Sequence, residues 1–365
     1  YYLKDQRQKD IAEELGLSTV DVSNCLQIAK HQGIVRFFID RSLEENLGDR
    51  LKQEFSHLQE VRVIVAARHS ETVPDSLLQQ LAKEGAQYLI KTVEPGESIG
   101  VSAGKTLGFI IDEIGTLHLQ KAAEFPANCR VYPLMLPEMA DIVPLNPLAL
   151  AVNLIKFLPW SSGRAFQLPS PENDKKQKSG ILDVYKEHPE IRAFRADIEK
   201  LDYYFTGIAA IDYARTPRIG TKSEALRTFE FNNLAWRYSL IEALKKYKAV
   251  GEMVHQPFDR EGNILIDEKG FEPLKERLLL LPLKKLHDHA VNDTASVVTV
   301  AGGPMRYEPL LAALRGKFFN VLITDSITAN YILDAMAKEK IASRPSESSE
   351  LKRNTPSPSP ASRSR

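Results

Sequence analysis

The chain has 365 residues, of which 43% are hydrophobic, and its 48 Lys and Arg residues balance its 48 Asp and Glu residues. This length allows two or three domains with a large core, and the zero net charge excludes an overall field that attracts nucleic acid or membranes. Two cysteines are too few for a disulfide framework or a zinc site, and we therefore expect a protein of the reducing cytoplasm. No apolar run approaches the roughly 20 residues of a membrane span, and we therefore expect no membrane partner.

Residues 1–41 are predicted to form a helix-turn-helix DNA-binding domain whose beginning is cut off. Gly16 permits the positive φ that ends a first helix, and Ser18 with Asp21 forms a capping box that starts a second helix. The apolar positions that would pack the second helix onto the first are Val22, Cys25, Leu26 and Ala29. Two helices around a glycine turn are typical of proteins whose second helix enters the DNA major groove. A helical hairpin that binds no DNA is the alternative.

The polar side chains of the second helix that face away from this apolar stripe would contact the bases. They are Thr19, Asp21, Ser23, Asn24, Gln27 and Lys30. Asn24 and Gln27 can each form a bidentate pair with adenine. Phosphate neutralisation dominates DNA affinity, and the equal numbers of acidic and basic residues in 1–41 argue against strong phosphate contacts.

Residues 42–338 are predicted to form a second domain that begins with a helix capped by Ser42. Its apolar stripe is Leu43, Leu47, Leu51, Phe55 and Leu58. The steps of four and three residues in this stripe indicate one buried helix face. We expect that face to lie on the following domain, and pairing with a second copy of the helix is the alternative.

From Val61 onward, strands and helices alternate. The expected strands are Val61–Ala66, Ser98–Ser102, Arg130–Leu134, Tyr204–Ala209, Asn263–Ile266, Val297–Ala301 and Val321–Thr324. The expected helices are Ser76–Lys91, Lys105–Ile114, Pro147–Phe157, Pro189–Leu201, Glu224–Tyr247, Pro309–Gly316 and Ile327–Lys338. This alternation predicts an α/β fold with a Rossmann-like parallel sheet covered on both faces. Residues 339–365, rich in Ser, Pro and Arg, are predicted to form a disordered tail.

A glycine turn at residues 98–107 is the first candidate ligand site, because open parallel sheets bind ligands at the carboxyl ends of their strands. Gly100 and Gly104 let the backbone approach an anion, and the start of the next helix offers free N–H groups. Ser102, Lys105 and Thr106 add hydroxyl groups and a positive charge. The spacing is one residue short of a Walker A loop, and a plain connection between strand and helix is the alternative.

A second glycine turn precedes a later helix. Gly302 and Gly303 open space there, and Arg306 could hold a phosphate through paired N–H groups. A surface arginine without a ligand is the alternative interpretation.

Catalytic and metal chemistry are not indicated. No nucleophile and base are spaced for catalysis, and no cofactor is expected. The polar run with His287, Asp288, His289 and Asp293 is expected to be a solvated turn rather than a metal site.

Several motifs in this order resemble those of the SorC-type bacterial transcriptional regulators, which control sugar operons, up to about residue 338. They are the end of the helix-turn-helix at residues 29–35, Ile99–Ser102 with Gly104 and Thr106, Gly207 with Ile208, residues 249–262 and residues 301–325. The resemblance implies a DNA-binding domain and an effector domain folded like glucosamine-6-phosphate deaminase and ribose-5-phosphate isomerase, without catalysis. It also implies a homo-oligomer, a dimer or tetramer, that binds operator DNA and a sugar or sugar phosphate.

The family's ligand positions and the two glycine turns together give the expected effector site. Its residues are Gly100, Ser102, Gly104, Lys105, Thr106, Asp259, Gly302, Gly303 and Arg306. Ala103 stands where the family usually has an aromatic residue, and Arg306 stands where it has Lys. Residues 134–137 lack the expected glycines and would leave less room for a sugar.

The hypothesis is therefore a regulator of a carbohydrate operon that responds to a sugar or sugar phosphate. An isomerase or deaminase-like enzyme is the first alternative, with Asp212, Asp259 or Asp325 as its base. A degenerate family member that only assembles with other subunits is the second.

Overall fold

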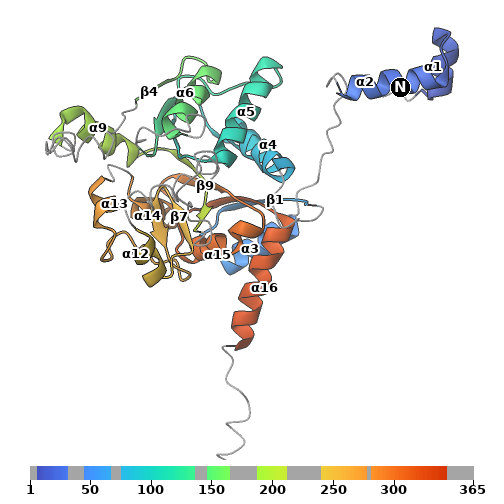
Figure 1. The fold of residues 1–365 in the computed structure, drawn as a ribbon. Helices are drawn as coiled ribbons and strands as arrows, with labels where there is room; N and C mark the ends of the chain where they lie inside the picture. The colour runs from blue at the N-terminus through green and yellow to red at the C-terminus, as the bar shows by residue number, and fades with distance from the viewer. Residues whose placement is uncertain are drawn as a thin grey trace, which may run out of the picture. The chain divides into compact units, whose positions relative to one another are not determined.

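The computed structural model describes residues 6–31, 45–66, 75–135, 146–164, 187–211, 240–277 and 281–342. The chain divides into two compact units, residues 1–42 and residues 43–365 (Figure 1). In the described part of the chain, no helix is both long enough and apolar enough to cross a membrane.

The first unit is a pair of helices, α1 (Gln8–Leu15) and α2 (Thr19–His31). Gly16 ends α1 with a φ of 64°, as predicted. The predicted capping box is also present, since the Asp21 amide donates to Ser18 Oγ at 3.1 Å and the Ser18 amide donates to the Asp21 carboxylate at 3.2 Å. Val22 is buried, but Cys25 is exposed, so the prediction that Cys25 packs against α1 is wrong. The contact between the two helices is narrower than the apolar stripe predicts.

The second unit is built on a seven-stranded sheet in which every pair of neighbouring strands is parallel. Its order is β1 (Glu60–Ile64), β10 (Val321–Asp325), β9 (Ser296–Val300), β5 (Tyr203–Thr206), β2 (Ser98–Val101), β3 (Arg130–Pro133) and β4 (Ser162–Gly163). Six of these strands fall on strands expected from the sequence, and the α/β fold class is confirmed.

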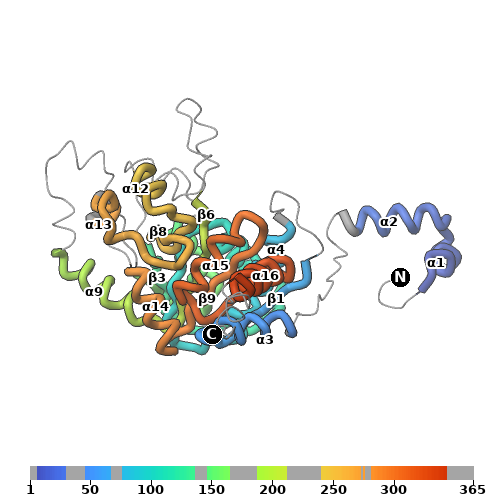
Figure 2. Tube along the Cα trace, turned by 90° about the horizontal axis from the view of Figure 1, so that it is seen from below, coloured from blue at the N-terminus to red at the C-terminus, as the bar shows by residue number. Residues whose placement is uncertain are grey.

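Helices cover both faces of this sheet (Figure 1). One face carries α4 (Asp75–Thr92), α5 (Lys105–Leu119) and α6 (Pro147–Phe157). The other carries α3 (Glu45–Glu54), α9 (Pro189–Ile198), α14 (Leu283–Asn292), α15 (Tyr307–Arg315) and α16 (Ser326–Ala342), several of which lie in front when the molecule is viewed from below (Figure 2). Along β10, Leu322 enters the core on the α16 side and Ile323 enters the core on the α4 side. A strand that is buried on both faces therefore appears in the sequence as a continuous apolar run.

The helix predicted to begin near Ser42 packs inside its own unit. Leu47, Leu51, Phe55 and Leu58 are buried in the core beneath the sheet, with Leu51 fully inaccessible. The expectation that this stripe lies on the following domain is confirmed for these four residues, and Leu43 lies outside the described residues.

A small antiparallel sheet stands beside the large one and was not predicted. It consists of β6 (Ala209–Ala210), β7 (Gly251–Met253) and β8 (Gln256–Phe258), and α12 (Ile241–Lys246) and α13 (Glu272–Arg277) lie near it in the chain. The strand expected at Asn263–Ile266 is wrong, because only an isolated bridge joins Ile264 to Phe258. Residues 224–239 of the helix expected at Glu224–Tyr247 lie outside the described residues.

Two further helices differ from expectation. The polar run around His287 is not a turn but α14, whose buried residues Leu283, Leu286 and Ala290 recur at helical spacing. The last helix, α16, runs to Ala342 and so includes the first four residues of the predicted tail. The remainder of that tail lies outside the described residues.

Candidate functional site

The candidate site lies where the connections of the large sheet change direction. β2 leads through α5 to β3 on one side, whereas the chain after β5 continues to β9 on the other side. β2 and β5 are neighbours, and Val101 pairs with Phe205 at their ends. Ligands in open α/β sheets bind in the crevice at such a point, beyond the carboxyl ends of the strands.

The start of α5 forms one wall of this crevice. Gly104 precedes the helix with a φ of 124°, and a Cβ atom added to it would meet nothing within 4 Å. The backbone turn is therefore open on the side of the crevice, where the N–H groups of the first helical turn are directed. Lys105 is exposed and places its Nζ 5.7 Å from the centre of the Phe109 ring, and Thr106 is buried behind it.

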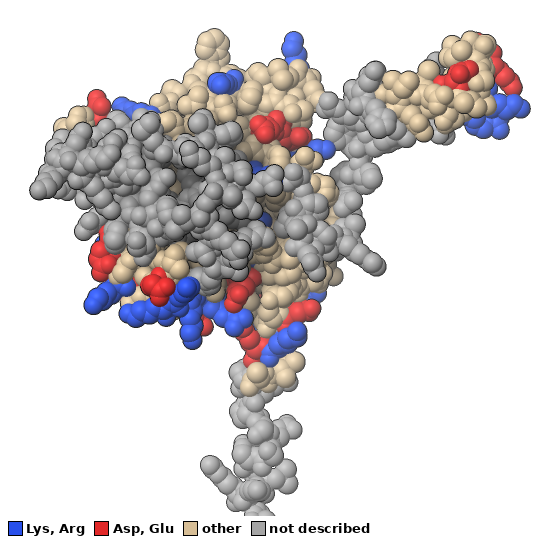
Figure 3. Space-filling view, viewed as in Figure 1, with Lys and Arg blue, Asp and Glu red and all other residues tan. Residues whose placement is uncertain are grey.

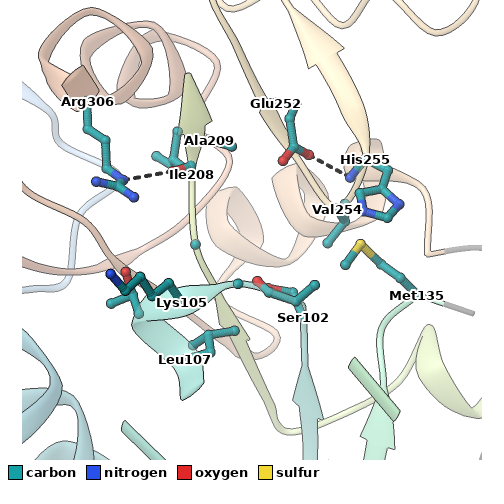
Figure 4. A pocket seen from close by; sticks show the side chains of 14 residues that line it. Ser102, Lys105, Leu107, Met135, Ile208, Ala209, Glu252, Val254, His255 and Arg306 are labelled. Atoms are coloured by element: carbon teal, nitrogen blue, oxygen red, sulfur yellow. Dashed lines mark hydrogen bonds between the residues drawn. The ribbon is translucent and has the colours of Figure 1, made fainter. Parts of the chain in front are cut away.

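Arg306 enters the same crevice from the short 3-10 helix η3 (Pro304–Arg306) that precedes α15. Its side chain is 9% exposed, and its Nε donates to the Ile208 carbonyl at 3.1 Å (Figure 4). Burial lowers the pKa of the guanidinium. Taking a cation out of water is costly, so an anion in the crevice would stabilise this arginine.

The turn between β7 and β8 closes the opposite end. Val254 and His255 have φ values of 45° and 61°, a conformation that L-residues adopt at a cost and that is least suited to a β-branched side chain. The His255 amide donates to the Glu252 carboxylate at 2.7 Å (Figure 4). Burial lowers the pKa of His255 to about 4, so its imidazole is neutral at pH 7.

Within the described residues, these walls line a cavity of about 70 Å³ that is partly open to solvent. It is lined by Ser102, Ala103, Gly104, Lys105, Thr106, Leu107, Met135, Gly207, Ile208, Ala209, Glu252, Val254, His255 and Arg306. Figure 4 shows Lys105 and Arg306 toward one end and Met135, Val254 and His255 toward the other. The cavity thus has a cationic end at a helix start and a second end with apolar and carboxylate groups.

Comparison with known proteins shows which families and relatives this chain resembles. Residues 219–334 match the Sugar-bind family model, described as "Putative sugar-binding domain". The chain is 25% identical to the deoxyribonucleoside regulator of Bacillus subtilis (strain 168) and 24% identical to the sorbitol operon regulator of Klebsiella pneumoniae. These alignments cover 92% and 91% of this chain and 95% of each relative.

Solved structures of transcriptional regulators have a fold similar to that of this chain. The full-length sorbitol operon regulator SorC from Klebsiella pneumoniae superposes with a TM-score of 0.60 at 21% identity, over 91% of this chain and 95% of that one. A transcriptional regulator from Streptococcus pneumoniae TIGR4 gives a TM-score of 0.59 at 21% identity, over 80% of this chain and 97% of that one. The resemblance to the SorC-type regulators is confirmed.

Five of the nine effector positions expected from the sequence line the cavity. They are Ser102, Gly104, Lys105, Thr106 and Arg306. They come from two segments about 200 residues apart in the chain, and the switch in strand order brings them together.

Three glycines among the nine, Gly100, Gly302 and Gly303, do not line it. A Cβ atom on Gly100 would lie 2.3 Å from Leu134 Cδ2, and one on Gly302 would lie 2.3 Å from the Asp325 carboxylate. Gly100 and Gly302 therefore let neighbouring elements approach closely. The Gly303 amide donates to the same carboxylate at 3.1 Å.

Asp259 of the SorC-type Phe-Asp motif also lies outside the lining. Its carboxylate accepts the amides of Glu261 and Asn263 and the side-chain amide of Asn263, at 2.8–3.1 Å. Gly262 in the same turn has a φ of 84°, and a Cβ atom there would lie 2.3 Å from the Gly316 amide nitrogen at the end of α15. The motif therefore forms a turn that rests on α15.

The sequence interpretation missed the far end of the cavity. Glu252 and His255 belong to residues 249–262, which entered the prediction only as a motif of the SorC-type resemblance, and Met135 was noted only for the lack of glycine around it. The pair Val254–His255 carries no turn signal, because Gly, Asn and Asp are the residues that favour two successive positive φ values. All of residues 251–258 are buried, so no alternation of buried and exposed positions marks this hairpin in the sequence.

Among the described residues, no group of three His, Cys, Asp or Glu side chains is placed to hold a metal ion. His287 Nδ1 lies 2.8 Å from the Gly316 carbonyl, and His289 contacts Thr294 and the Tyr204 hydroxyl. These contacts hold α14 against its neighbours.

The predicted DNA-contacting residues lie on α2 of the first unit. Thr19, Asn24 and Gln27 are exposed, Ser23 is half-buried, and Asp21 is exposed but bonded to Ser18 in the capping box. The side chain of Lys30 lies outside the described residues. On the face shown in Figure 3, the charged side chains of this unit gather over α1, with both signs present, and α2 is largely uncharged.

Proposed function

We propose that this chain is a DNA-binding transcriptional regulator of a carbohydrate operon, controlled by a sugar or sugar-phosphate effector. The observation that carries the proposal is the cavity at the switch point of the sheet, where the start of α5 and the buried Arg306 face one space. The names of the relatives, a deoxyribonucleoside regulator and a sorbitol operon regulator, support the same class.

The effector's phosphate would bind at the start of α5. Backbone N–H groups and the positive end of the helix dipole favour an anion there. Lys105 and Arg306 would add charge, and the hydroxyl groups of Ser102 and Thr106 would add donors. The effector site proposed here is the five-residue set that lines the cavity, and it leaves Gly100, Asp259, Gly302 and Gly303 as structural residues of the same domain.

DNA would be read by the first unit, with residues 1–41 as the DNA-binding domain and residues 42–338 as the effector and oligomerisation domain. Thr19, Asn24 and Gln27 are the base-contacting candidates, because their side chains are exposed on α2. Asp21 is more useful as the cap of α2 than as a base contact, because its carboxylate already bonds Ser18 at 2.7 Å. The protein would act in the cytoplasm, where its operator is.

Regulation would proceed by population shift in a homo-oligomer. Paired recognition helices bind two half-sites at a fixed spacing. An effector that binds one arrangement of the effector domains more tightly changes the fraction of molecules with the correct spacing. The response then depends on the difference in effector affinity between the two arrangements.

We further propose that the chain is not an enzyme. Acid–base catalysis needs a proton donor beside the base, and the groups at the far end of the cavity supply a poor pair. The Glu252 carboxylate accepts the His255 amide, and the His255 imidazole, with a pKa of about 4, is neutral at pH 7 and is therefore a poor general acid. Asp325 bonds the amides of Ile327 and Thr328 at the start of α16.

The test is an operator shift assay with the full chain and the upstream region of its own operon, with and without a panel of sugar phosphates. We expect a complex at low salt whose midpoint changes with one ester. Lys105→Gln should require about tenfold more ester for the same change, since a charge-assisted hydrogen bond contributes about 1.5 kcal/mol or more. Lys284→Gln on the exposed surface of α14 is the matched control and should respond as the wild type does. No complex under any of these conditions would refute the proposal.

A further inference from the structure

The outward face of α2 presents both amide and apolar side chains. Four exposed residues share the side of the helix that lies opposite the buried Val22, because they follow one another at steps of four, three and one residues. They are Val20, Asn24, Gln27 and Ile28. Val20 is 65% exposed and Ile28 is 53% exposed. The sequence interpretation considered only the polar side chains of this helix and therefore missed these two apolar ones.

This face carries no positive charge where its side chains are described. From Thr19 to Ala29, no residue of α2 is Lys or Arg, and Figure 3 shows little charge over this helix. The acidic side chain of Asp21 is engaged with Ser18 in the capping box. In the major groove, Arg and Lys bind guanine through its O6 and N7 atoms. The described side chains of α2 therefore offer no cation for a guanine.

The groups that are present on this face match the edge of an A·T base pair. The side-chain amide of Asn or Gln can bond the N6 and N7 atoms of adenine together, and an apolar side chain can pack against the methyl group of thymine. Val20 and Asn24 lie in the first two turns of α2, and the N-terminal residues of a recognition helix are those that contact the bases. They are separated by roughly 6 Å along the helix axis, about two base-pair steps.

We propose that α2 reads A·T base pairs, with Val20 against a thymine methyl group and Asn24 bonded to an adenine. The inference rests on the proposed DNA-binding function and names the base composition that each operator half-site must have where α2 meets it. Gln27 and Ile28 continue the same pattern one turn further along. Because Val20 and Asn24 are exposed, truncating either to alanine leaves the buried Val22 in place, and alanine favours the helix.

The first experiment equilibrates the full chain with a pool of random-sequence DNA duplexes at low salt and sequences the duplexes that bind. The selected half-sites should consist mainly of A·T pairs at the positions of strongest preference. Half-sites whose strongest preferences are for G·C pairs would overturn the inference while leaving DNA binding in place. DNA bound without any base preference would overturn it in the same way.

The second experiment tests the methyl contact of Val20 on the selected duplex. Each thymine is replaced in turn by deoxyuridine, which removes the methyl group and leaves the hydrogen-bonding groups unchanged. At one thymine of each half-site, the wild type should lose about fourfold in affinity, the value expected for one buried methyl group. Val20→Ala should bind the thymine and uracil duplexes equally. Val152→Ala, which truncates an exposed valine on α6, is the matched control and should keep the wild-type difference.

Asn24→Ala tests the amide contact on the same duplex. It should weaken binding about tenfold and abolish the preference for adenine at one position, because a bidentate pair is lost there. An unchanged base preference in Asn24→Ala, or a wild type indifferent to uracil at every position, would overturn the assigned contacts. A Val20→Ala protein that differs from the wild type in the mass of its assembly, and not in its response to uracil, would show that this face joins copies of the chain instead. Absence of binding to every duplex would count against the proposed DNA-binding function itself.

Discussion

Replacing Gly262 with alanine should destabilise the effector domain far more than the same change at Gly96. Both glycines have similar positive φ values, 84° and 89°. Alanine in this conformation should therefore lower the stability by a similar amount at each position, about 1–2 kcal/mol. They differ in their surroundings. A Cβ atom on Gly96 would meet nothing within 4 Å, whereas one on Gly262 would lie 2.3 Å from the Gly316 nitrogen and 2.7 Å from the Ala312 carbonyl oxygen.

The additional cost at Gly262 comes from backbone atoms that cannot rotate away. Relief requires the turn to move off the end of α15, and overpacking of this kind costs roughly 1–3 kcal/mol. We therefore expect Gly262→Ala to lose about 2 kcal/mol more than Gly96→Ala, which corresponds to a difference in Tm of roughly 3 °C for a domain of about 300 residues.

Urea unfolding of the two variants, followed by circular dichroism at 222 nm, measures this difference. The midpoint should fall little for Gly96→Ala and clearly for Gly262→Ala, with an unchanged slope. Equal losses for the two variants would refute the argument that the Asp259–Gly262 turn is pressed against α15.

Three further predictions concern other parts of the chain. Asp259→Ala should destabilise the domain by about 1 kcal/mol, because the amides of Glu261 and Asn263 lose their acceptor in an exposed turn. Effector affinity measured by calorimetry should stay within twofold, and a tenfold loss would place Asp259 in the effector site. Ser18→Ala removes the cap of α2 and should lower the stability of that helix by about 1 kcal/mol. Hydrogen exchange of the amides in the first turn of α2 should then accelerate about fivefold. Unchanged exchange would show that the cap contributes nothing. His255→Asn should weaken the loss of stability in acid, because burial lowers the pKa of His255 from 6.5 to about 4. The neutral imidazole therefore contributes fully to the free energy of unfolding above pH 6.5. This contribution, up to about 3 kcal/mol, is lost as the pH falls toward 4. Urea midpoints at pH 7 and pH 4.5 test this, and Asn suits the φ of 61° at that position; an equal acid loss in wild type and variant would contradict it.

The large sheet was predictable because its signal is local. Each central strand is an apolar run bounded by polar or glycine residues, and burial on both faces, as for Leu322 and Ile323 in β10, is what such a run indicates. Ser18 and Asp21 likewise form a cap that can be read from four consecutive residues.

The cavity was only half predictable. Its cationic end could be predicted, because a glycine that directly precedes a helix is a pattern visible in the sequence. Its far end depends on two strained residues, Val254 and His255, that contradict the usual turn chemistry and are held by the surrounding fold. Glycine before a helix is an ambiguous signal, because at positions 100 and 302 glycine also allows close packing against Leu134 and Asp325.

A crystal structure of the full chain with a bound sugar phosphate tests the proposed effector site most directly. The phosphate should lie at the start of α5, within hydrogen-bond distance of the amides of Lys105 and Thr106 and of the Arg306 guanidinium. A phosphate bound elsewhere, with this cavity filled by its own side chains, would contradict the proposed effector site.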